Sequence, residues 1–300
     1  MRDLDPILIE HAYELRGAGK AERSIDNRTY NLRLFETWAT ASDSPPDTVA
    51  DVTSGQINRW LSARAETDAP ETVLTRYRHL RAFFRWCERE EIVERSPMVN
   101  MREPNAETQP VPVLSPDELR ALFATTKKDT SFLGRRDFAM LAFLADTGVR
   151  VGELVALEID DLDFGKIGTA KVVGKFRRER TVAFSPKVGK VVLAYLRERA
   201  KHRLADDPHV WIGQRGALNV GAVWRVCTVR GEDAGIKNLH PHRLRHTFGH
   251  RFRAQGGAEG DLAQLGGWRS PAMLARYGAS AASERAVEAH GKVDPLGDVL

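Results

Sequence analysis

The sequence predicts a mainly α-helical protein whose C-terminal half is of the α+β class, with a small antiparallel β-sheet. Apolar residues at helical spacing fill most of the chain. Two β-prone runs, 170–173 and 180–184, interrupt the helices of the second half. Prolines without periodicity mark an extended linker between the halves. We therefore expect an all-helical domain at 1–103, a linker at 104–113 and a second domain at 114–300.

The N-terminal half is expected to be a set of helices. Apolar residues over 25–39 recur at helical spacing, and we expect Ser24 to be the N-cap of that helix. A short helix should begin near Ile57, and a longer one should cover residues 73–91. These segments would pack their apolar faces against one another.

The longer of these helices carries a stripe of arginines. Arg78, Arg81 and Arg85 are spaced i, i+3 and i+7, so their guanidinium groups share one side of the helix. Such a stripe can lie along DNA phosphates. The alternative is a solvated surface in which the arginines pair with Glu88 and neighbouring acids. The sequence leaves both interpretations open.

The second domain begins at a strong helix start. Ser115 and Glu118 form a capping box, with Pro116 at the first helical position. Another helix is expected at 135–145, and Gly148 should end it.

A new helix should then start near Arg150, for which Glu153 offers a salt-bridge partner at i+3. The two β-prone runs should follow as a hairpin, joined by a basic turn at 174–178. Beyond Pro186 the chain is expected to be mostly helical.

Charge and composition limit the classes of protein. Residues 1–103 carry a net charge of −3 and residues 104–300 of +7, against +4 for the whole chain. The basic half is typical of a polyanion-binding protein, although a solvated surface explains it equally well.

No apolar run is long enough to cross a membrane, and the N-terminus does not resemble a secretory signal. Cys87 and Cys227 match no metal or redox spacing, so we expect free thiols and a cytoplasmic location.

Six residues of the second half have the chemistry to cut and reseal a DNA strand. They are Arg150, Lys175, His242, Arg245, Trp268 and Tyr277. The forks of two arginines could hold the non-bridging oxygens of a phosphodiester, whose charge grows in the transition state. Because His242 and Arg245 are three residues apart on a helix, both could face one target.

The remaining members of this set would move protons and form a bond. Tyr277 is the expected nucleophile, and its phosphotyrosine ester would conserve the energy of the broken linkage, so no nucleotide cofactor is needed. Lys175 is the expected general acid for the departing 5′ oxygen, although Arg177 or Arg178 in the same turn could reach the phosphate instead. Trp268 can pack around the site and donate one N–H.

The ordered motifs resemble those of the tyrosine recombinase (phage integrase) family, including its Xer-type members. Segment 147–154 resembles the family's first-arginine box, and 173–182 resembles its β-hairpin lysine segment. Segment 242–248 resembles the His-x-x-Arg box, and 265–268 with Tyr277 resembles the terminal box that carries the nucleophile.

The resemblance implies a core-type DNA-binding domain before a catalytic domain, with Arg78, Arg81, Arg85, Arg177 and Arg178 as DNA-binding candidates. It also implies double-stranded DNA with a specific crossover site as the partner, one dimer per site, a tetrameric synapse and a Holliday junction. No metal or other cofactor is expected.

The family resemblance also carries two finer expectations. Most relatives have histidine where this chain has Trp268, so we expect Trp268 to be mainly a packing residue whose loss is less harmful than that of Arg245. A short helix at 280–290 should dock on a neighbouring protomer.

Three alternatives remain from the sequence. His242, His246 and His250, spaced i, i+4 and i+8, could bind zinc in a hydrolase, although Arg243 and Arg245 would repel a cation. A type IB topoisomerase would use similar chemistry. A DNA-binding protein that has lost cleavage would keep the fold alone.

Overall fold

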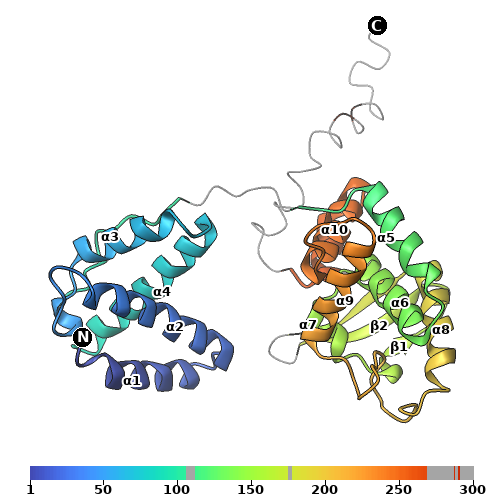
Figure 1. The fold of residues 1–300 in the computed structure, drawn as a ribbon, viewed down its shortest axis with the longest axis horizontal. Coiled ribbons are helices and arrows are strands. Elements are labelled where there is room, and N and C mark those ends of the chain that lie inside the picture. Colours follow the sequence, from blue (N-terminus) through green and yellow to red (C-terminus); the bar gives the residue numbers. More distant parts are fainter. Residues whose placement is uncertain (106–111, 175–177, 269–286, 288–289, 291–300) are drawn as a thin grey trace, which may run out of the picture. The chain divides into compact units, whose positions relative to one another are not determined.

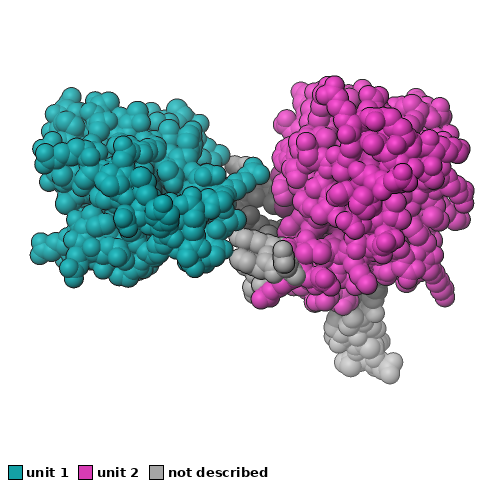
Figure 2. All heavy atoms as spheres, turned by 90° about the horizontal axis from the view of Figure 1, so that it is seen from below, with its two compact units in different colours: residues 1–109 teal, residues 110–300 magenta. Residues whose placement is uncertain are grey.

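The computed structural model describes residues 1–105, 112–174, 178–268, 287 and 290. The chain divides into two compact units, Met1–Gln109 and Pro110–Leu300 (Figure 2). Described elements are mostly helices, with one three-stranded antiparallel sheet in the second unit. The predicted fold class is therefore confirmed. The division falls within segment 104–113, whose role as a linker stays a prediction.

The first unit is a bundle of helices (Figure 1). Its elements are α1 (Leu4–Gly17), α2 (Glu22–Thr40), the 3-10 turn η1 (Val49–Asp51), α3 (Ser54–Ala65) and α4 (Pro70–Arg89). Aromatic side chains fill its core, where Trp60 meets Phe35 edge to face with ring centroids 5.4 Å apart. Burial of such large side chains is the main stabilising contribution.

The start of α2 differs from the expectation. Its N-cap is Ala21, so the prediction of Ser24 at that position is wrong. Glu22 occupies the first turn, where a carboxylate interacts favourably with the helix dipole. Glu22 also accepts a hydrogen bond of 2.8 Å from Arg16 at the end of α1, and this tertiary contact accompanies the earlier start.

The second unit is built around α6 (Phe132–Thr147), most of whose side chains are buried. This helix packs against α5, α8, α10 and β3. The other helical elements are α5 (Pro116–Lys128), α7 (Val151–Val155), η2 (Ile159–Asp161), α8 (Pro186–Arg199), α9 (Val220–Asp233), α10 (Pro241–Ala254) and α11 (Glu259–Gly266). At the start of α5, Ser115 and Glu118 form the predicted capping box, with bonds of 3.1 and 2.7 Å.

The sheet has the order β1-β2-β3, with β1 (Leu162–Asp163), β2 (Gly168–Val173) and β3 (Glu179–Phe184). Strands β2 and β3 form the predicted hairpin, and Val172 lies opposite Arg180. The Gly174 N–H donates to the Arg178 carbonyl at 2.8 Å and extends the ladder to the turn. Strand β1, with two residues, has too short a pattern to be predicted. No helix in the described part of the chain is long and apolar enough to cross a membrane.

Candidate active site

Arg150 lies between the end of α6 and the start of α7. Gly148 ends α6 with φ +60°, a conformation that favours glycine, and a Cβ there would lie 2.3 Å from the Phe248 ring. The chain then turns into α7, with Arg150 as its N-cap residue. Glu153 accepts bonds from the Arg150 backbone N–H at 2.8 Å and from its Nη1 at 3.0 Å, which confirms the expected partner. The Arg150 side chain is still 40% exposed, so it can meet a ligand.

Arg245, on α10, is almost fully buried, with 4% exposure. Its Nη1 donates to the Gly148 carbonyl, and its Nη2 donates to the Gly266 carbonyl at 2.6 Å. The guanidinium carbon lies 4.1 Å from the centroid of the Trp268 ring, in cation–π geometry. The position of this arginine is therefore fixed by backbone carbonyls and by an aromatic ring.

Three arginines meet at the end of α11. Arg180, Arg245 and Arg150 donate to the carbonyls of residues 265, 266 and 267, at 2.9, 2.6 and 2.8 Å respectively. We call these three residues the arginine cluster. Helices end with unsatisfied carbonyls, and cations are favourable there. The cluster brings both predicted catalytic arginines to adjacent peptide groups, although they are 95 positions apart in sequence.

Glu153 is the acidic counterpart of this cluster. Its side chain is 3% exposed and accepts from both Arg150 and Arg180. Burial by itself raises the pKa of Glu153, but hydrogen bonds from Arg180 and Arg150 outweigh burial and hold the pKa below its ordinary value. The carboxylate is thus ionised at neutral pH. One negative and three positive charges leave a surplus that attracts an anion.

Arg180 is the member that the sequence reasoning missed. In β3, Arg180 alternates with Glu179 and Thr181 and shares a side of the strand with the buried Val182 and Phe184. An arginine on the buried side of a strand needs a partner, because an unpaired buried charge is costly. That alternation is the signal that could have identified it.

His242 is the second residue of α10; its side chain reaches solvent but is partly covered, and it lies close enough to Arg245 and Arg150 to feel their charges. Partial burial lowers the pKa of His242 below its ordinary value, and the charges of Arg245 and Arg150 lower it further. The imidazole is therefore neutral near pH 7 and can accept a proton. The prediction that His242 and Arg245 face one target from the same side of the helix holds only in part. Arg245 is buried, whereas His242 reaches solvent.

Trp268 belongs to a small apolar cluster with Phe248 and Leu262. Its ring is 4% exposed and stacks on Phe248 with centroids 6.5 Å apart. A Cβ on Gly266 would lie 2.0 Å from the indole, so this close approach requires glycine. These contacts agree with the expected packing role of Trp268.

Some predicted site residues lie outside the described residues. They are Lys175, Arg177, Tyr277 and all of the expected helix 280–290 except residues 287 and 290. Arg178, at the edge of the hairpin turn, is described and exposed. The catalytic roles of the six residues stay predictions.

The arginine stripe of the first unit has partners that the sequence did not indicate. Arg78 and Arg81 pair with Glu103, at 2.6 and 3.5 Å, rather than with Glu88. Together with Arg85 and with Arg28 of α2, they line a cavity of about 430 Å³. The surface is thus both basic and partly neutralised, so DNA binding by this stripe also stays a prediction.

The histidines of α10 gain no support as a zinc site. Among the described residues, no group of three or more His, Cys, Asp or Glu side chains could hold a metal ion. Cys87 and Cys227 are free thiols, as expected; both are also buried, and burial raises the pKa of each thiol to about 12.

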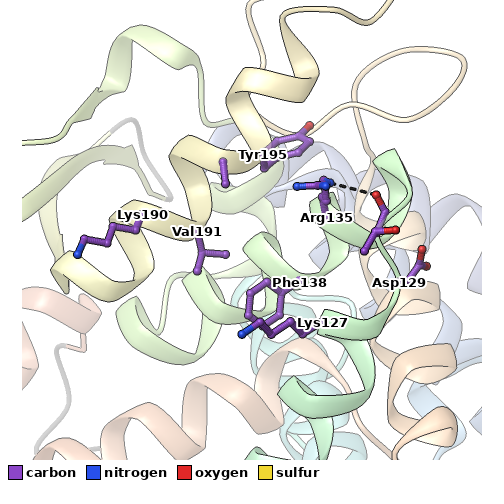
Figure 3. Close-up of a pocket in the computed structure, with 9 residues that line it drawn as sticks. Lys127, Asp129, Arg135, Phe138, Lys190, Val191 and Tyr195 are labelled. Carbon is purple, nitrogen blue, oxygen red and sulfur yellow. Dashed lines mark hydrogen bonds between the residues drawn. The ribbon is translucent and has the colours of Figure 1, made fainter.

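One cavity of the second unit does not coincide with the arginine cluster. A cavity of about 350 Å³ lies among α5, α6 and α8, where Phe138 and Val191 supply apolar lining and Lys127 and Lys190 supply charge (Figure 3). Arg150 and Arg245 are not among the described residues that line it. Small-molecule sites are usually concave and apolar, whereas a duplex needs an open basic surface.

Comparison with known proteins agrees with these motifs. Residues 112–284 match the model of the phage integrase family. Tyrosine recombinase XerC of Oceanobacillus iheyensis is 35% identical over 208 residues, which cover 67% of each protein.

Solved structures show the same fold at lower identity. The XerH site-specific recombinase, bound to its difH substrate after cleavage, superposes with a TM-score of 0.76 at 18% identity and covers 94% of this chain and 82% of its own. A lambda integrase dimer bound to a core site has a TM-score of 0.70 at 17% identity, with coverage of 91% and 76%. The chain thus belongs to the phage integrase family and is a tyrosine recombinase, an enzyme that cuts and rejoins DNA strands.

Proposed function

We propose that this recombinase cuts its crossover site by attack of Tyr277 on the scissile phosphorus, forming a 3′-phosphotyrosyl ester and releasing a 5′ hydroxyl. Arg150 and Arg245 bind the non-bridging oxygens, whose charge grows in the transition state. The observation that carries this proposal is that their guanidinium groups hold adjacent carbonyls at the end of α11. Attack of the 5′ hydroxyl of another strand on the ester then completes strand exchange without a metal or nucleotide cofactor.

Two residues handle protons in this scheme. Lys175 protonates the leaving 5′ oxygen, which is otherwise a poor leaving group. His242 assists removal of the Tyr277 proton. The lowered pKa of His242 favours that role, because the neutral imidazole is the form that accepts a proton. Trp268 supports Arg245 by packing.

The assembly follows from the chemistry of exchange. One protomer cuts one strand, so a dimer binds each site. Two occupied sites form a tetramer, and the DNA within it passes through a Holliday junction. The dimer of lambda integrase on its core site supports this arrangement by analogy. The reaction class includes DNA integration, excision and dimer resolution, and a DNA substrate favours a cytoplasmic location.

A nicked suicide substrate tests this proposal. Cleavage near the nick releases a short fragment, so religation is prevented and the covalent adduct accumulates. We expect a DNA adduct at Tyr277, identified by peptide mapping, and none with Tyr277→Phe, which should bind DNA nearly as well. An adduct formed by Tyr277→Phe would refute the assignment of the nucleophile.

A further inference from the structure

We propose that Arg180 is a positioning residue for strand cleavage, which keeps the charge of Arg150 available to the scissile phosphate by occupying Glu153. This inference rests on the proposed function of Arg150.

The ion pair between Arg180 and Glu153 is bidentate. Nη1 donates to Oε1 at 2.6 Å and Nη2 donates to Oε2 at 2.8 Å, so the planar fork takes both oxygens. The two side chains are 11% and 3% exposed, and water competes little for these bonds. Because Glu153 also accepts from the N–H and Nη1 of Arg150, Arg180 fixes the carboxylate that orients Arg150.

A backbone contact links the same arginine to the end of α11. The Nε of Arg180 donates to the Leu265 carbonyl at 2.9 Å. A Cβ on Gly267 would lie 3.2 Å from both Arg150 Nη1 and Arg180 Cζ, so the two guanidinium groups flank that glycine. Arg180 thus joins strand β3, helix α7 and the C-terminal end of α11 at one point.

The charge balance explains why a second arginine is needed. With Arg180 in place, Glu153 is shared by two cations, and the Arg150–Arg180–Glu153 group has a net charge of +1. Without Arg180, the buried carboxylate has Arg150 as its remaining partner within this group, and that pair is neutral. The charge of Arg150, which already donates to Glu153, would then be neutralised by that carboxylate and be less available to a phosphate. The Arg150 side chain is 40% exposed and so can reach a phosphate. A loss of its available charge would therefore weaken phosphate binding directly.

Single-turnover cleavage of three suicide substrates tests this inference. One has an ordinary scissile phosphodiester. The second has a methylphosphonate there, which lacks the negative charge of the non-bridging oxygens. The third has a 5′-bridging sulfur, whose departure needs no protonation. The variants are Arg180→Ala, Arg180→Lys and Arg150→Ala, and Arg197→Ala of α8 is the matched control, because Arg197 is an exposed arginine of the same unit.

We expect Arg180→Ala to cleave the phosphodiester about 10- to 100-fold more slowly, the usual cost of a misplaced catalytic group. On the methylphosphonate, the difference from wild type should shrink to a few-fold, as for Arg150→Ala, because less charge must be neutralised. On the sulfur-bridged substrate the difference should persist. Arg180→Lys keeps the charge but not the fork, so it should lie between wild type and Arg180→Ala. Arg197→Ala should match wild type.

Two outcomes would overturn the inference. An equal loss on all three substrates, with a lowered melting temperature, would mean that Arg180 only stabilises the fold. Rescue by the sulfur substrate alone would mean that Arg180 serves the leaving-group acid and not Arg150. Should Arg180→Ala fail to fold, Arg180→Lys is compared on the same substrates. Failure of the proposed function is separate, since wild-type protein would then form no adduct at Tyr277.

Discussion

Replacement of Trp268 by alanine separates packing from chemistry at this site. The indole is 4% exposed, stacks on Phe248 and lies 4.1 Å from the Arg245 guanidinium carbon. Loss of a buried tryptophan typically destabilises a protein by about 3–5 kcal/mol. Because the apolar cluster here is small and distinct from the main core, it can partly collapse, so we expect about 3 kcal/mol.

The effect on cleavage should be smaller than that of losing the cation itself. Arg245 keeps its bonds to the Gly148 and Gly266 carbonyls in Trp268→Ala, so its charge stays near the site while its position loosens. We expect cleavage about 10- to 100-fold slower, against a loss of about 3–4 kcal/mol in transition-state stabilisation for Arg245→Ala. Trp268→Phe keeps an aromatic ring over Arg245 and lacks the indole N–H, so it should retain most activity.

Urea unfolding and single-turnover adduct formation measure the two effects separately. A Trp268→Phe variant as slow as Trp268→Ala would refute the packing role, since a hydrogen bond from the indole would then be the function of this residue. A Trp268→Ala variant as slow as Arg245→Ala would also refute it, because packing alone would not explain so large a loss.

Three further predictions concern the first unit and the C-terminus. Burial lowers the pKa of His11 to about 4, with Arg28 adding to the shift. The folded state therefore binds fewer protons than the unfolded state between pH 4 and 6.5, so the free energy of unfolding should rise by about 3 kcal/mol across that window. Urea titrations at several pH values should show this slope. An equal slope in His11→Gln would contradict the prediction. Glu103→Gln should free Arg78 and Arg81 from their ion pairs and raise the affinity for non-specific DNA a few-fold, with a steeper salt dependence. Unchanged binding between about 50 and 200 mM salt would mean that this surface does not contact phosphates. Deletion of all residues after Ala279 should spare binding to a single site and impair synapsis, and normal recombination by the truncated protein would exclude the docking of the C-terminal segment on a neighbour.

The fold could be predicted from sequence wherever the signal is local. Proline and a capping box mark the start of α5, and Gly148 marks the end of α6. Alternation marks the β2–β3 hairpin, whereas the two residues of β1 leave no pattern. Ser24 is not an N-cap because α2 already begins at Glu22, where the exposed Arg16–Glu22 contact from α1 accompanies the helix start. Such tertiary contacts commonly override local preference.

The candidate site was predictable where a residue and its partner are close in sequence, whereas Arg180 and the long-range partners were not. Glu153 was found because it lies one helical turn from Arg150. Glu103 is 25 positions from Arg78, and Leu265 is 85 positions from Arg180, so no short-range rule connects them. The burial of Arg245 could not be predicted either, because the motif indicates that the arginine contacts a ligand and not how much of its side chain is covered by protein.

The contacts at the end of α11 affect how any alanine scan of this enzyme should be interpreted. Arg150 and Arg245 each donate a hydrogen bond to a carbonyl of the Gly266-Gly267 pair. Replacing either one by alanine therefore removes a hydrogen bond that caps the helix end together with a positive charge. A measured drop in turnover would then combine folding and electrostatics in one value. Citrulline, incorporated by chemical ligation, keeps a donor-bearing shape while discarding the charge. Only such an isostere would isolate how much of the rate comes from the cation.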